Sequence, residues 1–333
     1  MSRTNQIAEV RAALLGADRL LLVSHHNPDG DAIGSSLALA AGLGALGKEC
    51  DVVNVDGVPL NLTWLPLAER VLLHPEAAAR YEAVVLLDCG NPSRTGLEPA
   101  VFDGVPTTVN IDHHPGNGDF GHANLVDPDA CATAELVWEV LQALAAPVGY
   151  SAAVSIYTAV LTDTGSFRFS NANASAFDIA SKMVARGVSP ALVAQLVYDQ
   201  QPIGRLRLLS QVLETLELSP RDKAASVLVT QAMFRETHTG VEDVDGFVNH
   251  PRSILGVEVG ILLREEGPAR YRVALRSKGR VDVSRIAREF GGGGHRNAAG
   301  ATIDGTPEAI RRLVYARVEE ACDEELLRGN PLG

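Results

Sequence analysis

The apolar and polar positions of this chain follow the pattern of an α/β protein. Short apolar runs with the length of a buried strand alternate with longer segments that have helical spacing. In the first half of the chain the pattern predicts strands at Leu20–Val23, Cys50–Val55, Ala83–Leu87, Thr108–Ile111 and Ala123–Val126. It predicts helices at residues 5–15, Ala32–Leu46, Ala132–Leu144 and Ser151–Leu161. Strands and helices that alternate in this way favour a mainly parallel sheet flanked by helices.

The second half of the chain begins with a helical stretch and then changes character. Residues 175–215 have helical spacing interrupted by Gly187, Pro190 and Pro202, and strand-like runs follow at Ser226–Thr230, Val257–Leu263 and Tyr271–Leu275, with a helix at Val283–Phe290. A chain of 333 residues exceeds the usual size of a single core. We therefore expect an N-terminal α/β domain over residues 1–188, a helical connector over 189–215, and a smaller α/β domain over 216–333.

Polar side chains gather where the predicted strands of the first domain end. His25, Asp29 and Asp31 follow the first strand, and Asp88 follows the strand Ala83–Leu87. The triplet Asp112-His113-His114 ends the strand Thr108–Ile111, whereas Asp163 follows a helix. Open α/β sheets bind ligands at the carboxyl ends of their strands, so these residues are expected to meet. Asp31 is also placed to cap the helix that follows it.

Carboxylates and imidazoles without a thiolate favour Mn²⁺ or Mg²⁺ over a structural zinc ion. The candidate metal ligands are His25, Asp29, Asp31, Asp88, His113 and Asp163. Six ligands are too many for one open catalytic ion but suit two ions that share a bridging carboxylate, the role expected of Asp88. Two ions about 3.5–4 Å apart can activate a water and stabilise an in-line phosphoryl displacement. The imidazoles favour Mn²⁺ over Mg²⁺.

A second candidate site lies in the C-terminal half. Four consecutive glycines, Gly291 to Gly294, precede His295 and Arg296, and the pair Arg276-Ser277 ends a predicted strand. Glycine backbone N–H groups can surround an anion, and the charged side chains can add bonds to a phosphate. Residues 251–300 hold ten Arg or Lys against five Asp or Glu, although the whole chain has a net charge of −12. That net charge argues against a protein that coats long nucleic acid, whereas the local excess suggests a confined anion site.

Composition limits the class and the location of the protein. Hydrophobic residues make up 46% of the chain and charged residues 21%, which is typical of a globular domain. There is no apolar run of about 18 residues, so no membrane span is expected. The N-terminus lacks the apolar core of a signal peptide, and the four cysteines form no CxxC pair. A cytoplasmic location is expected.

These motifs together resemble the DHH phosphoesterase superfamily. The set His25-x-x-Pro28-Asp29-x-Asp31, Asp88, Asp112-His113-His114 and Asp163 is similar to that of the superfamily. The run from Gly291 to His295 resembles the nucleotide-binding loop of the C-terminal domain that accompanies many DHH domains. Residues 162–170 and the length resemble the NrnA-type oligoribonucleases. The resemblance covers nearly the whole chain.

The resemblance implies a role for each of these residues. His25, Asp29 and Asp88 would hold one Mn²⁺, and Asp31, Asp88, His113 and Asp163 the other. His114 would face the scissile phosphate, while Asp112 would orient the two histidines. The nucleotide would be gripped from across a cleft between the domains by residues of the second domain: Arg276, Ser277, Gly292, Gly293, Gly294, His295 and Arg296.

The resemblance also implies an activity. Family members shorten oligoribonucleotides of two to a few nucleotides to nucleoside monophosphates, and many remove the 3′-phosphate of 3′-phosphoadenosine 5′-phosphate (pAp). The charge argument sets the expected limit here at about five nucleotides. Homodimers are common in the superfamily, so a homodimer is expected.

Four other functions remain open. A cyclic-di-AMP or pApA phosphodiesterase would share every metal ligand. A long-strand exonuclease of the RecJ kind and a manganese pyrophosphatase are less favoured, because the chain is short and acidic and carries the glycine run. From a different class, the protein could be a catalytically silent nucleotide sensor, although its metal-ligand set is intact.

Overall fold

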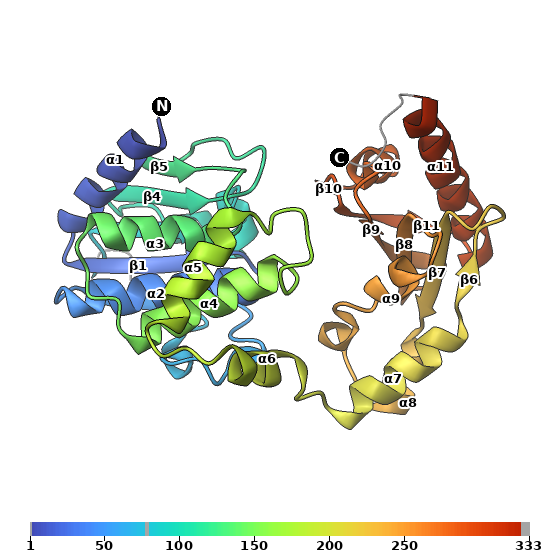
Figure 1. Ribbon diagram of the computed structural model, residues 1–333, viewed down its shortest axis with the longest axis horizontal. Coiled ribbons are helices and arrows are strands. Elements are labelled where there is room, and N and C mark those ends of the chain that lie inside the picture. The colour runs from blue at the N-terminus through green and yellow to red at the C-terminus, as the bar shows by residue number, and fades with distance from the viewer. Residues whose placement is uncertain (1, 77–79, 328–333) are drawn as a thin grey trace. The chain divides into compact units, whose positions relative to one another are not determined.

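The computed structural model describes residues 2–76 and 80–327, which form two compact units. Unit 1 comprises residues 1–200 and unit 2 residues 201–333 (Figure 1). The division falls inside the stretch 189–215 that was expected to connect the domains. Of the two helices in that stretch, α6 (Pro190–Tyr198) belongs to unit 1 and α7 (Ile203–Glu214) to unit 2.

Among the described residues, unit 1 contains a five-stranded sheet in which every pairing is parallel. The strand order is β2-β1-β3-β4-β5. The strands are β1 (Arg19–Ser24), β2 (Glu49–Val53), β3 (Ala83–Leu87), β4 (Thr107–Asp112) and β5 (Ala123–Val126). The five strands predicted for this half are confirmed, and every residue of β3 is buried, as expected for a strand covered on both faces.

Helices cover one face of this sheet in two layers. Helices α2 (Gly30–Ala45) and α3 (Thr133–Ala143) form the inner layer and pack against the strands. Helices α4 (Tyr150–Asp163) and α5 (Ala174–Val184) form the outer layer and pack on the inner helices (Figure 1). The first helix, α1 (Arg3–Leu15), lies beside β5 and α3. On the opposite face, Leu21, Val23, Val84 and Leu86 pack against side chains from the segments that precede and follow β4: Leu97, Val101, Phe102 and Phe120.

Short 3₁₀ helices occupy the loops of unit 1. They are η1 (Leu60–Leu62), η2 (Ala68–Arg70), η4 (Pro92–Thr95) and η5 (Pro99–Val101). Two of these single turns, η4 and η5, lie in the connection between β3 and β4.

Unit 2 contains, within the described chain, a six-stranded mixed sheet with the order β10-β11-β9-β8-β7-β6. Only the pair β7–β8 is parallel. The strands are β6 (Glu217–Leu218), β7 (Ala224–Val229), β8 (Val259–Gly267), β9 (Arg270–Ser277), β10 (Gly293–His295) and β11 (Ala298–Asp304). The strands β7, β8 and β9 were predicted from the sequence. The strands β10 and β11 were missed, because their glycine and alanine residues do not give the apolar alternation of a strand.

Helices pack on both faces of this second sheet. Helices α10 (Val283–Glu289) and α11 (Pro307–Leu327) cover one face. Helices α7, α8 (Gln231–Thr237) and α9 (Asn249–Ser253), with η6 (Val241–Val244), cover the other face over β7 and β8. No described helix of either unit is long and apolar enough to cross a membrane.

A close contact between α2 and α4 brings together two of the predicted metal ligands, Asp31 and Asp163. A Cβ atom on Gly30 would lie 2.1 Å from Thr162 Oγ1, and one on Gly34 would lie 2.6 Å from the Ser155 carbonyl oxygen. Only glycine permits this approach. As a result the start of α2, with Asp31, lies against the end of α4, with Asp163.

This contact predicts opposite effects for two Gly→Ala changes in α2. Gly34→Ala should lower the free energy of unfolding by about 1–3 kcal/mol, because the new methyl group overpacks against α4. Gly44→Ala is the matched control, because a Cβ there meets no described atom within 4 Å. It should raise the free energy of unfolding by about 0.5–1 kcal/mol through the lower entropy of the unfolded chain. Urea unfolding of both variants measures the difference, and equal effects would contradict the packing argument.

Candidate metal centre and active site

Asp29 begins the first functional segment by capping α2. Its carboxylate accepts hydrogen bonds from the backbone N–H groups of Asp31 and Ala32, both at 3.0 Å. The prediction that Asp31 caps this helix is therefore wrong. Asp31 lies inside the first turn, because the chain bends into the helix two residues earlier than the apolar pattern indicated.

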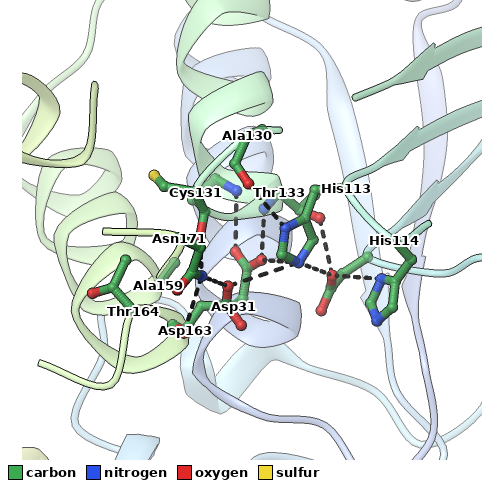
Figure 2. A network of polar contacts seen from close by, with 12 residues as sticks. Asp31, His113, His114, Ala130, Cys131, Thr133, Ala159, Asp163, Thr164 and Asn171 are labelled. Carbon is green, nitrogen blue, oxygen red and sulfur yellow. Dashed lines mark hydrogen bonds and ion pairs between the residues drawn. The ribbon is translucent and has the colours of Figure 1, made fainter. Parts of the chain in front are cut away.

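Asp31 instead caps a different helix. Its buried carboxylate accepts hydrogen bonds from Thr133 N at 2.6 Å and Ala134 N at 3.0 Å, which are the first N–H groups of α3 (Figure 2). The N-cap residue of α3 is Ala132, which has no polar side chain. The carboxylate therefore supplies the missing acceptor and lies at the positive end of the helix dipole.

Asp88 lies directly after β3 and faces two groups of residues at once. Its Oδ2 lies 3.3 Å from His25 Nε2, while its Oδ1 lies 3.7 Å from His113 Nε2. Its backbone has φ +55°, in the left-handed region that Asp tolerates better than most residues. Strained backbone of this kind occurs more often at functional sites.

The two histidines of the triplet have different partners. Asp112 Oδ1 accepts a hydrogen bond from His114 Nδ1 at 2.7 Å, and its Oδ2 accepts one from Asn117 at 2.6 Å. His113 Nδ1 instead bonds the Ala130 carbonyl oxygen at 3.2 Å. Asp112 was expected to orient both histidines. Its two oxygens instead accept from His114 and Asn117, so its hydrogen bonds orient His114 and not His113.

Asp163 is the last residue of α4, as expected, and lies beside this group. Its Oδ2 is 3.8 Å from His113 Nε2 and accepts a hydrogen bond from Asn171 Nδ2 at 2.9 Å. Figure 2 shows Asp31, Asp163 and His113 converging, with Asn171 beside Asp163.

The predicted ligands converge into groups with the donor chemistry of a divalent metal site. His25, Asp29 and Asp88 form one group, and Asp31, His113 and Asp163 form a second. The ligand atoms within each group lie within 4.8 Å of one another. A third group of Asp88, His113 and His114 overlaps the other two. Oxygen and imidazole donors in this arrangement fit oxygen-preferring divalent ions.

The protonation of the cluster reflects its buried negative charge. Burial, followed by the negative charge of Asp88, raises the pKa of Asp31 to about 7. Burial and the charge of Asp31 raise the pKa of Asp163 well above its usual range. Burial alone would lower the pKa of His25 and His113, but the neighbouring carboxylates outweigh it and raise each to about 9. Burial would raise the pKa of Asp88, yet the adjacent imidazoles hold it below its usual range. The cluster therefore retains protons that a metal ion could replace.

The glycine run of unit 2, which was predicted to be a binding loop, ends a helix and then forms a strand. The N–H groups of Gly291 and Gly292 bond the carbonyl oxygens of Arg288 and Ala287, which ends α10. Gly293 to His295 then form β10, paired with β11. A Cβ on Gly294, whose φ is +142°, would lie 2.5 Å from the Ala298 carbonyl oxygen. At least two of the four N–H groups are thus unavailable to an anion, and close strand packing accounts for part of the glycine content.

Two of the predicted substrate-binding side chains nevertheless share one face of this sheet. His295 pairs with Ala298, and Ala298 pairs with Arg276, so their side chains project to the same side. His295 is exposed and Arg276 is half-buried. Ser277 is buried and accepts a hydrogen bond from Gly279 N at 2.8 Å, while Arg296 donates weakly to the carbonyl oxygens of Gly279 and Arg280.

Sequence reasoning missed Arg272 on the same face. It is exposed, and its Nη2 lies 3.6 Å from the point where a Cβ on Gly300 would stand. Arg272 is separated from Arg276 by an even number of positions on one strand, so the two side chains project to the same face, and this spacing could have identified Arg272. Thr133, Asn117 and Asn171 were also missed. Thr133 contacts Asp88 across 45 residues of sequence. Asn117 and Asn171 are local to Asp112 and Asp163, but they lie outside helices and strands, where periodicity gives no signal.

Comparison with known proteins agrees with this arrangement. The DHH family, N-terminal domain, matches residues 19–163, and the DHHA1 domain matches residues 225–324. The chain is 38% identical over 331 residues to the bifunctional oligoribonuclease and PAP phosphatase NrnA of Thermus thermophilus, covering 98% of this chain and 95% of the relative. The chain belongs to the NrnA-type DHH phosphoesterases.

Two further relatives of this DHH protein extend the likeness. The bifunctional oligoribonuclease and PAP phosphatase NrnA of Bacillus subtilis is 26% identical, covering 92% of this chain and 96% of the relative. A solved structure of an exopolyphosphatase-related protein from Bacteroides fragilis matches with a TM-score of 0.89 at 28% identity. That match covers 97% of this chain and 98% of the other. The DHH and DHHA1 domains correspond to units 1 and 2.

The raised pKa values of His25 and His113 predict that metal binding to this DHH domain releases protons. Both pKa values lie near 9, so both rings carry a proton at pH 7 when no metal is bound, and a ligand nitrogen must lose it. We expect release of about two protons from the histidines at pH 7, with a further contribution from Asp31 and Asp163, and Mn²⁺ affinity that weakens as the pH falls below 9. Calorimetric titration in buffers of different ionisation enthalpy measures the release. A binding enthalpy independent of the buffer would contradict this prediction.

Proposed function

We propose that this protein is a metal-dependent phosphoesterase that degrades oligoribonucleotides of about two to five nucleotides and removes the 3′-phosphate of pAp. The position of Asp88 between two groups of metal-competent side chains carries the proposal. The relatives from T. thermophilus and B. subtilis, named as bifunctional oligoribonucleases and PAP phosphatases, support the choice of substrates.

The proposed cofactors are two Mn²⁺ ions, with Mg²⁺ as a substitute. His25, Asp29 and Asp88 would hold one ion, and Asp31, Asp88, His113 and Asp163 the other. Such a pair supplies an activated water and charge stabilisation for an in-line displacement at phosphorus. The number of donors and their mixture of carboxylate and imidazole support this assignment.

His114 is the proposed contact with the scissile phosphate. Its Nδ1 bonds Asp112 Oδ1, which fixes the orientation of the ring. An imidazolium ring held in this orientation would donate a hydrogen bond from its second nitrogen to a phosphate oxygen. Asn117 holds the other oxygen of Asp112, so this carboxylate cannot rotate away from the histidine.

The proposed nucleotide-binding residues are those of unit 2 that were predicted from the sequence. Arg276 and His295 share a sheet face with Arg272, which makes that face basic. We include Gly292, Gly293, Gly294, Ser277 and Arg296 in the proposal as the segments that shape this face. A homodimer and a cytoplasmic location complete the proposal, in keeping with substrates that arise from RNA decay.

A cyclic-di-AMP or pApA phosphodiesterase is the second candidate, since its chemistry needs the same cluster. A silent nucleotide sensor is disfavoured, because each predicted metal ligand lies in one of the groups described above.

Substrate length is the experiment that tests the proposed function. With Mn²⁺ present, kcat/KM should be highest for dinucleotides and should fall steeply beyond about five nucleotides, because an acidic surface repels a longer phosphate chain. The measurement uses 5′-labelled RNAs of two to two dozen nucleotides at fixed salt, together with pAp and cyclic di-AMP. Asp88→Asn is the control and should abolish turnover of all of them. Equal efficiency on the longest RNA would support a long-strand exonuclease instead.

The proposal assigns metal binding to unit 1 and nucleotide binding to unit 2, and this assignment gives a second prediction. Arg276→Ala and His295→Ala should raise KM for the dinucleotide pApA about tenfold or more and leave Mn²⁺ affinity unchanged, because a lost charge-assisted bond costs roughly 1.5–3 kcal/mol. Arg270→Ala is the matched control. Arg270 is an exposed arginine on the same strand and the same face, further from His295. Steady-state kinetics and Mn²⁺ titration measure both effects, and weakened Mn²⁺ binding in either variant would show that unit 2 also determines the metal site.

A further inference from the structure

Thr133 is a fully buried residue at the first position of α3, and it contacts two carboxylates of the cluster. Its Oγ1 donates a hydrogen bond to Asp88 Oδ1 at 2.9 Å. Its backbone N–H donates to Asp31 Oδ2 at 2.6 Å. We infer that Thr133 is a positioning residue that fixes the shared carboxylate Asp88 between the two metal-binding groups. This inference rests on the proposed function.

The hydroxyl of Thr133 has a specific task in this arrangement. Asp88 must turn Oδ2 toward His25 and Oδ1 toward His113 in order to serve both groups. A carboxylate can rotate about its terminal bond, and that torsion is broad. A donor fixed on the Oδ1 side selects one rotation and leaves the remaining lone pairs of both oxygens for ligands. Partners of this kind orient metal-binding carboxylates.

The backbone that carries Thr133 is itself held in place. Glu135 accepts a hydrogen bond from Cys131 N at 2.8 Å, which closes the turn before α3. Arg3 of α1 binds Glu135 at 3.0 Å and Asp127 at 2.8 Å, on either side of the same turn. The Ala130 carbonyl oxygen in that turn bonds His113. One turn of chain therefore sets the positions of Asp31, Asp88 and His113 relative to one another.

The decisive variant is Thr133→Val, which keeps the shape of the side chain and removes its hydroxyl. It should weaken Mn²⁺ binding about 10–100-fold and lower kcat on pApA, because Asp88 loses its fixed rotation. Thr133→Ser retains the hydroxyl and should restore both quantities to within about threefold of wild type. The readouts are calorimetric Mn²⁺ titration, kinetics on pApA, and thermal melts of the metal-free proteins.

Thr158→Val is the matched control for replacing a buried threonine hydroxyl. Thr158 is fully buried in α4, and its Oγ1 bonds the Val154 carbonyl oxygen of its own helix at 2.8 Å. The Thr158→Val change should alter the melting temperature without changing Mn²⁺ affinity. Wild-type Mn²⁺ affinity in Thr133→Val, equal Mn²⁺ losses in both valine variants, or no rescue by serine would each overturn the inference.

The same experiment separates this inference from the proposed function. If the wild-type protein binds Mn²⁺ but does not cleave pApA or pAp, the proposed function fails, and the titrations still decide the role of Thr133. If the wild type cleaves pApA and Thr133→Val matches it in Mn²⁺ binding and turnover, only the inference about Thr133 fails.

Discussion

The structure of unit 1 depends on bringing Asp31, Asp88 and Asp163 together in a place where water screens them poorly. Like charges at such distances repel, and burial disfavours each charge separately. The raised pKa values of Asp31 and Asp163 express this cost. The surrounding residues offset it: His25 and His113 carry protons, the first N–H groups of α3 bond Asp31, and a divalent ion would neutralise the rest. A divalent cation would therefore stabilise this cluster, and the proposed function calls for the same cation.

The fold brings these carboxylates together by using helix ends as well as strand ends. Asp88 and Asp112 arrive on adjacent parallel strands, β3 and β4, whose carboxyl ends meet at one edge of the sheet. Asp31 and Asp163 arrive on α2 and α4, which approach closely at Gly30 and Gly34. The start of α3 then joins the two sets, because its first residues bond both Asp31 and Asp88. These five elements must therefore be in place before the carboxylates can meet.

The glycine run of unit 2 shows how one composition serves two demands. Gly291 and Gly292 end α10, while Gly294 allows β10 to pair closely with β11. Both demands are structural, yet the hairpin they build places His295 in one row with Arg276. In the proposed binding site the glycines would position these side chains, in addition to supplying any N–H group that they leave available.

The sequence by itself determined the α/β class, the strands of the first sheet and the set of metal-competent residues. Short apolar runs of strand length record burial, and polar residues at their ends are costly unless they have a role. The tertiary structure alone decided which helix Asp31 caps, which histidine Asp112 holds, and that Thr133 lies against Asp88. It also decided that the glycine run forms a strand. These features depend on contacts between segments about 45 to 100 residues apart in the cases of Asp88 and Asp31. Local periodicity carries no information about such pairs, because it reports which face of an element is buried and not what that face meets.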